Sequence, residues 1–206
     1  METLRFLASW FLPLRTALST SHIPWTLRWR LLALQPIALL TNSLKYLPYA
    51  LSRRYKVLAI PTRGRHELRA IVFEPSMSPR PKSKPHMNGL RPLHIDFHGG
   101  AFVGGIAEYD ADFCSLLSDR AAAVVISAEY RCAPAHVYPA AHEDAEDVVD
   151  WVLANAELLW RADPKTLTVS GFSAGGNLMM VAGARARAGV GFYAAVSGRM
   201  TRVRDG

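Results

Sequence analysis

The stretch Thr168-Val-Ser-Gly-Phe-Ser-Ala-Gly-Gly-Asn177 decides the predicted fold, because it joins an apolar run directly to a helix of small residues. Its centre, residues 171–175, is a G-x-S-x-G sequence. Glycines on either side of Ser173 let the backbone bend sharply without a Cβ clash, and the bend pushes the hydroxyl out above the C-terminal edge of a sheet. We therefore predict a strand over 167–170, a tight turn at Ser173 and a helix over 174–184.

A second glycine-rich segment lies upstream, where residues 98–105 read His-Gly-Gly-Ala-Phe-Val-Gly-Gly directly after a predicted strand at 93–97. Glycines in such a loop let backbone N–H groups approach a developing negative charge closely. The alternative is a phosphate-binding or merely connecting loop. The order of strand, glycine loop and downstream serine turn favours the charge-stabilising interpretation.

The remaining pattern predicts alternating strands and helices. Two short runs, 57–60 and 68–73, flank a turn at 62–65 and predict a leading hairpin. The run 123–128 (AVVISA) is apolar except for Ser127, as expected of a strand buried on both faces of a parallel sheet. Residues 141–160 predict a long helix whose buried stripe is Ala145, Val148, Val149, Val152, Ala156 and Leu159. The fold class is therefore α/β, with a mostly parallel sheet behind an antiparallel hairpin.

The composition further narrows the class of protein that the chain can be. With 206 residues, of which 50% are apolar and 20% charged, the chain is long enough for one α/β domain and is not wholly disordered. Cys114 and Cys132 are too few for a disulfide scaffold and lack zinc-site spacing, so both are predicted to be core residues. Residues 1–95 hold 15 basic and 3 acidic side chains, whereas residues 96–206 hold 9 and 14.

The basic N-terminal third has no acidic residue between Glu2 and Glu67 and interleaves arginines with tryptophans and leucines. Its longest apolar stretches, 6–14 and 31–40, contain prolines and fall short of the ~20 residues of a spanning helix. We weigh helices that cover another part of the protein against peripheral contact with an anionic membrane. A signal peptide and an organellar leader are weaker alternatives, so localisation stays open, with cytoplasmic or peripheral membrane placement favoured. No nucleic-acid reading motif is present.

Between the two glycine segments, residues 130–145 read YRCAPAHVYPAAHEDA. Together with HGGA at 98–101, Asp-Pro at 163–164 and GFSAGGN at 171–177, this resembles the hormone-sensitive-lipase-like family, also called the α/β-hydrolase fold-3 group. The family patterns are Y-R-L-A-P-E-x-x-x-P-A-x-x-E-D, H-G-G-G, D-P and G-D-S-A-G-G-N. The resemblance therefore covers residues 93–180 in four ordered motifs.

What the resemblance implies is a serine hydrolase that acts on small carboxylic esters without a metal or an organic cofactor. Ser173 would be the nucleophile, and the backbone N–H groups of Gly99, Gly100 and Ala174 would form the oxyanion hole. His98 and Ala101 would support that loop. The implied organisation is a helical N-terminal cap segment over 1–54, a partial hydrolase core over 55–184 and an Arg/Gly-rich tail over 185–206 that does not resemble the family.

Four positions depart from the family pattern: Ala101 replaces a glycine, Cys132 a leucine, Ala135 a glutamate and Phe172 an acidic residue. Alanine still supplies an N–H group, so the oxyanion loop stays feasible if residue 101 accepts its backbone angles. The other three departures affect local loop and substrate contacts rather than the reaction class.

The family's acid and histidine have no counterpart in this sequence. All seven histidines precede Ser173, and Asp205 is the only carboxylate side chain after it. We therefore expect a C-terminally truncated sheet with little or no turnover, and we carry two functions forward. The first is an esterase by descent with an incomplete triad; the second is a non-catalytic acyl-binding or membrane-surface protein. A nucleotide site is rejected, because neither phosphate-loop glycine pattern is present.

Overall fold

The computed structural model describes residues 54–76 and 89–194, together with scattered positions between 11 and 40. Predictions for the rest of 1–53 and for 195–206 lie outside the described residues. In chain order the elements are β1 (Lys56–Pro61), β2 (Glu67–Phe73), β3 (Leu93–Phe97), the 3-10 turn η1 (Ala107–Asp110), α4 (Ala111–Ala121), β4 (Val124–Ala128), α5 (Ala140–Trp160), η2 (Pro164–Thr166), β5 (Thr168–Phe172), α6 (Ala174–Ala182), η3 (Gly183–Arg185) and β6 (Ala188–Phe192).

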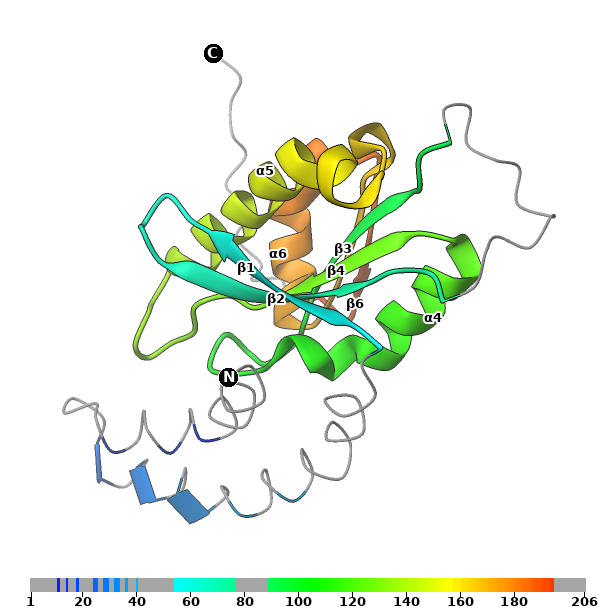
Figure 1. Cartoon of the computed structure of the whole chain (residues 1–206). Helices are drawn as coiled ribbons and strands as arrows, with labels where there is room; N and C mark the ends of the chain where they lie inside the picture. Colours follow the sequence, from blue (N-terminus) through cyan, green and yellow to red (C-terminus); the bar gives the residue numbers. More distant parts are fainter. Residues whose placement is uncertain are drawn as a thin grey trace.

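One mixed sheet orders its strands β1-β2-β4-β3-β5-β6. The pairs β1/β2 and β2/β4 are antiparallel, whereas β3 pairs in parallel with β4 and β5, and β6 pairs in parallel with β5. Helices α5 and α6 cover one face of the sheet, and α4 covers the other (Figure 1). The predicted α/β architecture with a leading hairpin is confirmed.

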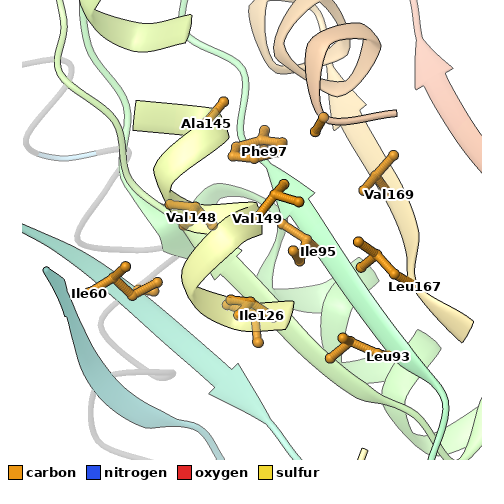
Figure 2. Close-up of a cluster of buried hydrophobic side chains, with 14 of the residues drawn as sticks. Ile60, Leu93, Ile95, Phe97, Ile126, Ala145, Val148, Val149, Leu167 and Val169 are labelled. Atoms are coloured by element: carbon orange, nitrogen blue, oxygen red, sulfur yellow. The ribbon is translucent and has the colours of Figure 1, made fainter. Parts of the chain in front are cut away.

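The larger core lies between α5 and the central strands. Figure 2 shows Val148 and Val149 of α5 directed toward Ile95 and Ile126 of the sheet, all of them fully buried. The predicted helix stripe is right except at its end: Leu159 is 47% exposed, and Trp160 is buried in its place. The helix ends there because Arg161 takes a left-handed conformation, and Trp160 packs edge-on against Trp151.

The turn between β1 and β2 is fastened to the start of α5. Buried Asp144 accepts hydrogen bonds from the Arg131 backbone N–H at 2.7 Å and from Arg131 Nε at 2.9 Å, and His66 Nε2 lies 3.1 Å from its other side. Arg63 pairs with Asp147, one turn further along. The Tyr-Arg and Glu-Asp ends of the family motif are therefore joined by an ion pair that holds the loop between them.

On the α4 face, a buried ion cluster fixes the segment that follows the glycine loop. Glu108 is fully buried and accepts hydrogen bonds from Tyr55 Oη at 2.8 Å and from Arg69 Nη1 at 3.0 Å. Arg69 also donates to Glu129 at 2.8 Å. Buried charges need such complete pairing to be tolerated. Residues 107–110 form the 3-10 turn that carries Glu108 into this cluster.

The outer strands differ in sequence and exposure. Strand β6 continues the sheet beyond residue 184 and exposes four of its five residues. Cys114 is fully buried, as predicted, and Cys132 is partly buried against the core. Within the residues that the structure describes, no helix is both long and apolar enough to span a membrane.

We predict that Ile126→Ala lowers the free energy of unfolding by about 2–5 kcal/mol, because it leaves a cavity in the fully buried centre of β4. Urea denaturation measures this loss. Leu158→Ala is the matched control: Leu158 is 84% exposed on α5, so the change should stay within about 0.5 kcal/mol. Equal losses in the two variants would contradict this description of the core.

Candidate active site

The serine turn and the glycine loop meet because β3 and β5 are parallel neighbours. Phe97 is the register partner of Gly171, so both chains leave the sheet at the same edge. A Cβ added to Gly99 would lie 3.6 Å from Ser173 Cβ and 3.1 Å from the Phe172 carbonyl oxygen. The two segments singled out in the sequence are therefore in direct contact.

Ser173 occupies a strained turn. Its φ of 52° and ψ of −112° fall outside the usual regions for a residue with a side chain, and α6 begins at the next residue. Packing enforces the turn: a Cβ on Gly175 would lie 1.8 Å from the Phe97 carbonyl oxygen, and one on Gly171 would lie 2.1 Å from the Gly175 carbonyl oxygen. The Ser173 N–H also donates to the Phe192 carbonyl at 2.9 Å, so β6 anchors the turn.

The glycine loop holds three consecutive residues at positive φ: Gly100 at 140°, Ala101 at 53° and Phe102 at 60°. Ala101, the departure from the family glycine, therefore accepts the left-handed conformation, which costs about 1 kcal/mol or more for a residue with a Cβ. Two backbone bonds stabilise the loop, from the Val103 N–H to the Gly100 carbonyl at 3.0 Å and from the Ala133 N–H to the Phe102 carbonyl at 2.7 Å.

His98 is packed inside the base of this loop. Its Nδ1 lies 2.7 Å from the Gly99 carbonyl oxygen, and because a carbonyl only accepts, Nδ1 carries the hydrogen. The ring stacks on Tyr130, whose hydroxyl donates to the His98 carbonyl at 2.8 Å. Burial lowers the pKa of His98 to about 4, so the imidazole is neutral near pH 7.

Phe172 takes part in an aromatic cluster that the sequence pattern did not reveal. It stacks on Phe192 at 4.5 Å and meets Phe113 edge-on at 5.4 Å. The replacement of the family's acidic residue by phenylalanine thus fills the space between β5, β6 and α4. Aromatic side chains 20 or more residues apart gave no local signal of this contact.

His142 is a second feature that the sequence reasoning did not identify as part of the site's surroundings. Its Nε2 lies 2.9 Å from Asn177 Oδ1, one turn after Ser173 on α6. Its ring stacks on Phe102 of the glycine loop at 5.8 Å. His142 therefore links α5 to both segments of the site. Its place in the motif, between alanines and acids, predicted only a helix start.

The Ser173 hydroxyl is not hydrogen-bonded to a basic side chain in the described part of the chain. Over residues 54–76 and 89–194, no histidine or carboxylate side chain forms a hydrogen bond with the Ser173 hydroxyl. The same ranges contain no group of three or more His, Cys, Asp or Glu side chains arranged to hold a metal ion.

The assembled geometry is a serine hydroxyl on a strained strand-to-helix turn, with glycine amides and a helix N-terminus beside it. Amides and a helix N-terminus favour negative charge, which is what forms when a hydroxyl attacks a carbonyl. Fold and turn together are characteristic of the α/β-hydrolase class.

Comparison with known proteins agrees with this class. The family model described as alpha/beta hydrolase fold matches residues 94–198, and the chain belongs to that family. The match extends beyond residue 184, across β6. The resemblance to the fold-3 group stated from the motifs is confirmed, and the chain is a carboxylesterase-like α/β-hydrolase.

Among its relatives, Esterase LipI of Mycobacterium tuberculosis is 41% identical over 96 residues, which are 47% of this chain and 30% of that protein. The carboxylesterase CXE2 of Papaver somniferum, named for 3-O-acetylpapaveroxine, is 36% identical over 48% of this chain and 35% of its own length. The chain spans about a third of the length of these relatives. Of solved structures, the metagenomic carboxylesterase EstE1 aligns with a TM-score of 0.61 at 29% identity, covering 81% of this chain and 57% of EstE1.

We predict that Gly175→Ala destabilises the protein by at least about 2 kcal/mol, because its Cβ would overlap the Phe97 carbonyl oxygen. The expected fall in Tm is about 4–8 °C for a chain of this size. Gly104→Ala is the control, since a Cβ there meets nothing within 4 Å. Thermal unfolding of both variants checks the claim, and an unchanged Tm for Gly175→Ala would show that the turn is not held by this contact.

Proposed function

We propose that this chain carries the nucleophile and the oxyanion hole of an esterase acting on small carboxylic esters. The observation that carries the proposal is the contact between the strained Ser173 turn and Gly99 of the glycine loop. The relatives named as esterases support the reaction class, and the family membership supports the role of Ser173.

In the proposed reaction, Ser173 Oγ attacks the acyl carbonyl carbon and its proton passes to water, which returns a proton to the departing alcohol. The carbonyl oxygen becomes an oxyanion, held by the N–H groups of Gly99, Gly100 and Ala174. Collapse of this intermediate releases the alcohol, protonated on its oxygen, and leaves an acyl-serine ester that water then hydrolyses. His98 supports the oxyanion loop through its bond to the Gly99 carbonyl, and Ala101 extends the loop.

No described histidine or carboxylate side chain is hydrogen-bonded to the Ser173 hydroxyl, and we infer from this that turnover by this chain is weak. Removal of the histidine from a serine triad lowers turnover about 10⁶-fold, while the oxyanion hole and binding retain a small acceleration over water. The other outcome that we keep is a protein that binds acyl groups without turning them over.

Ser173→Ala tests the proposal. We expect the parent chain to hydrolyse a short p-nitrophenyl ester slowly. In the variant, the hydrolysis rate should fall to the spontaneous rate measured without protein. Mass spectrometry after incubation with a fluorophosphonate should show one adduct, on Ser173, in the parent chain. Equal ester rates with no adduct would exclude Ser173 nucleophilic chemistry and leave the acyl-binding alternative. Gly104→Ala serves as a control for folding and handling.

We further propose that the basic N-terminal segment touches anionic membrane surfaces. The supporting observation is the exposure of large apolar side chains at helical positions, including Trp25 at 70%, Trp29 at 51% and Leu18 at 63%. Exposed tryptophans beside arginines suit the boundary between headgroups and acyl chains.

Sedimentation with phosphatidylserine-containing vesicles tests this second proposal. Binding should weaken several-fold between low salt and physiological salt, since Lys and Arg contribute about 1 kcal/mol each at an anionic surface. Phosphatidylcholine vesicles are the lipid control, and a Trp25→Ser/Trp29→Ser double variant should bind less. Absent or salt-insensitive binding would rule out the surface role.

A further inference from the structure

A chain of buried polar side chains crosses from β3 to β5 on the α4 face, directly below the site loops. Asp96 and Ser170 are register partners, and 2.5 Å separates Asp96 Oδ1 from Ser170 Oγ. His94 Nε2 lies 2.8 Å from Ser170 Oγ, and His94 Nδ1 lies 2.7 Å from Thr168 Oγ1. Because β3 and β5 lead into Gly99 and into Ser173, this chain joins the two strands that carry the site.

Each hydroxyl and each neutral imidazole has a single hydrogen to donate, and this limits which side chain is the donor in each contact. The Thr168 hydroxyl is directed at the Leu93 carbonyl at 3.4 Å, so its contact with His94 calls for a hydrogen on Nδ1. A neutral imidazole then has a bare Nε2, which accepts the single hydrogen of Ser170. The Ser170–Asp96 contact is satisfied in that case only if the carboxyl group itself donates. With an ionised Asp96, Ser170 must donate to it instead, and His94 must donate from Nε2.

Burial and charge decide between these arrangements. Asp96 is fully buried, and its Oδ2 has no hydrogen-bond partner among the described residues. The groups facing it are the Asp110 carboxyl from η1, the Cys114 thiol from α4 and the Ser127 hydroxyl from β4. The Ser127 hydroxyl donates to the Ala107 carbonyl, at 2.9 Å.

A carboxylate in that place would therefore be desolvated and beside a second acid, which is strongly unfavourable. Burial, with the repulsion from Asp110, raises the pKa of Asp96 to about 7, although hydrogen bonds from Ser170, Cys114 and Ser127 oppose the rise, and burial lowers the pKa of His94 to about 4. Both shifts favour a neutral acid facing a neutral imidazole.

We propose that Asp96 is protonated in the folded protein and donates to Ser170, heading a neutral chain Asp96–Ser170–His94–Thr168 that holds β3 and β5 in register beneath the site. Loss of this proton as the pH rises through about 7 places a charge in a fully buried position and reverses the donors of the chain, since Ser170 must then donate to Asp96 and His94 from Nε2. The buried charge destabilises the folded protein. This inference is independent of ester hydrolysis and applies whether or not Ser173 reacts.

Spectroscopy of the parent chain tests the proton's position. The infrared spectrum at pH 5.5–6 should contain the carbonyl band of a protonated carboxylic acid, which disappears as the pH is raised and is absent in Asp96→Asn. The ¹⁵N shifts of His94 should be those of a neutral ring protonated at Nδ1. Absence of the acid band in the parent chain, or a His94 protonated at Nε2, overturns the proposal even if the variant fails to fold.

The pH dependence of stability gives a second test. The folded-state pKa of Asp96 is raised above its unfolded value of about 3.8, so the folded chain holds an extra proton between about pH 4 and 7. This contribution to stability is present below that window and is lost as the pH rises through it. Asp96→Asn keeps a neutral donor, so its unfolding constant relative to that of the parent should fall by up to about 10³-fold across the window. His98, which lies outside this hydrogen-bonded chain, contributes equally in both proteins.

Leu158→Ala is the control, because Leu158 is exposed on α5 and does not titrate, so its ratio to the parent should stay flat over the same range. A flat ratio for Asp96→Asn as well would overturn the proposal. Ser170→Ala removes the middle link and should destabilise the protein at pH 5.5, where the chain is complete. No loss of stability in Ser170→Ala would also count against a continuous chain.

Discussion

Parallel pairing of β3 with β5 is the constraint on which the candidate site depends. The pairing sets Phe97 opposite Gly171 and so delivers the glycine loop and the serine turn to the same edge of the sheet. The turn then closes only because Gly171 and Gly175 let backbone approach backbone within distances that no Cβ would permit. The position of Ser173 follows from strand register and glycine packing together.

Contacts from the surrounding structure hold the glycine loop and the serine turn in their strained backbone conformations. Three consecutive positive φ angles in the loop and an unusual ψ at Ser173 are each unfavourable for an isolated chain. Their supports come from distant segments: Tyr130 stacks on His98, and the Phe192 carbonyl binds the Ser173 N–H. The ion pair between Arg131 and Asp144 fixes the loop that carries one of these supports.

The sequence predicted what depends on local chemistry or on period. The glycines around Ser173, the mainly apolar run in β4 and the stripe of α5 each predict their structure from a few neighbouring residues. The structure confirms them, except for Leu159 at the end of the stripe. Contacts between distant residues were not predictable in this way. Nothing local distinguishes Leu159 from Trp160 as the buried end of α5, and nothing in the spacing of Phe172, Phe113 and Phe192 announces that their rings meet. The buried partners of Glu108 and Asp96 likewise come from separate strands, so their residue types alone gave no indication of burial.

The two edge strands of the sheet, β1 and β6, differ in how far they discourage pairing with a further strand. Strand β1 is bounded by Lys56 and Pro61, a charge and a residue without an N–H, both of which discourage pairing with another strand. Strand β6, Ala-Gly-Val-Gly-Phe, contains neither a charged residue nor a proline, and four of its five residues are exposed. Addition of a further strand is thus favoured on the side next to Ser173, and anything that pairs there bears directly on the carbonyl of Phe192 that steadies the serine turn.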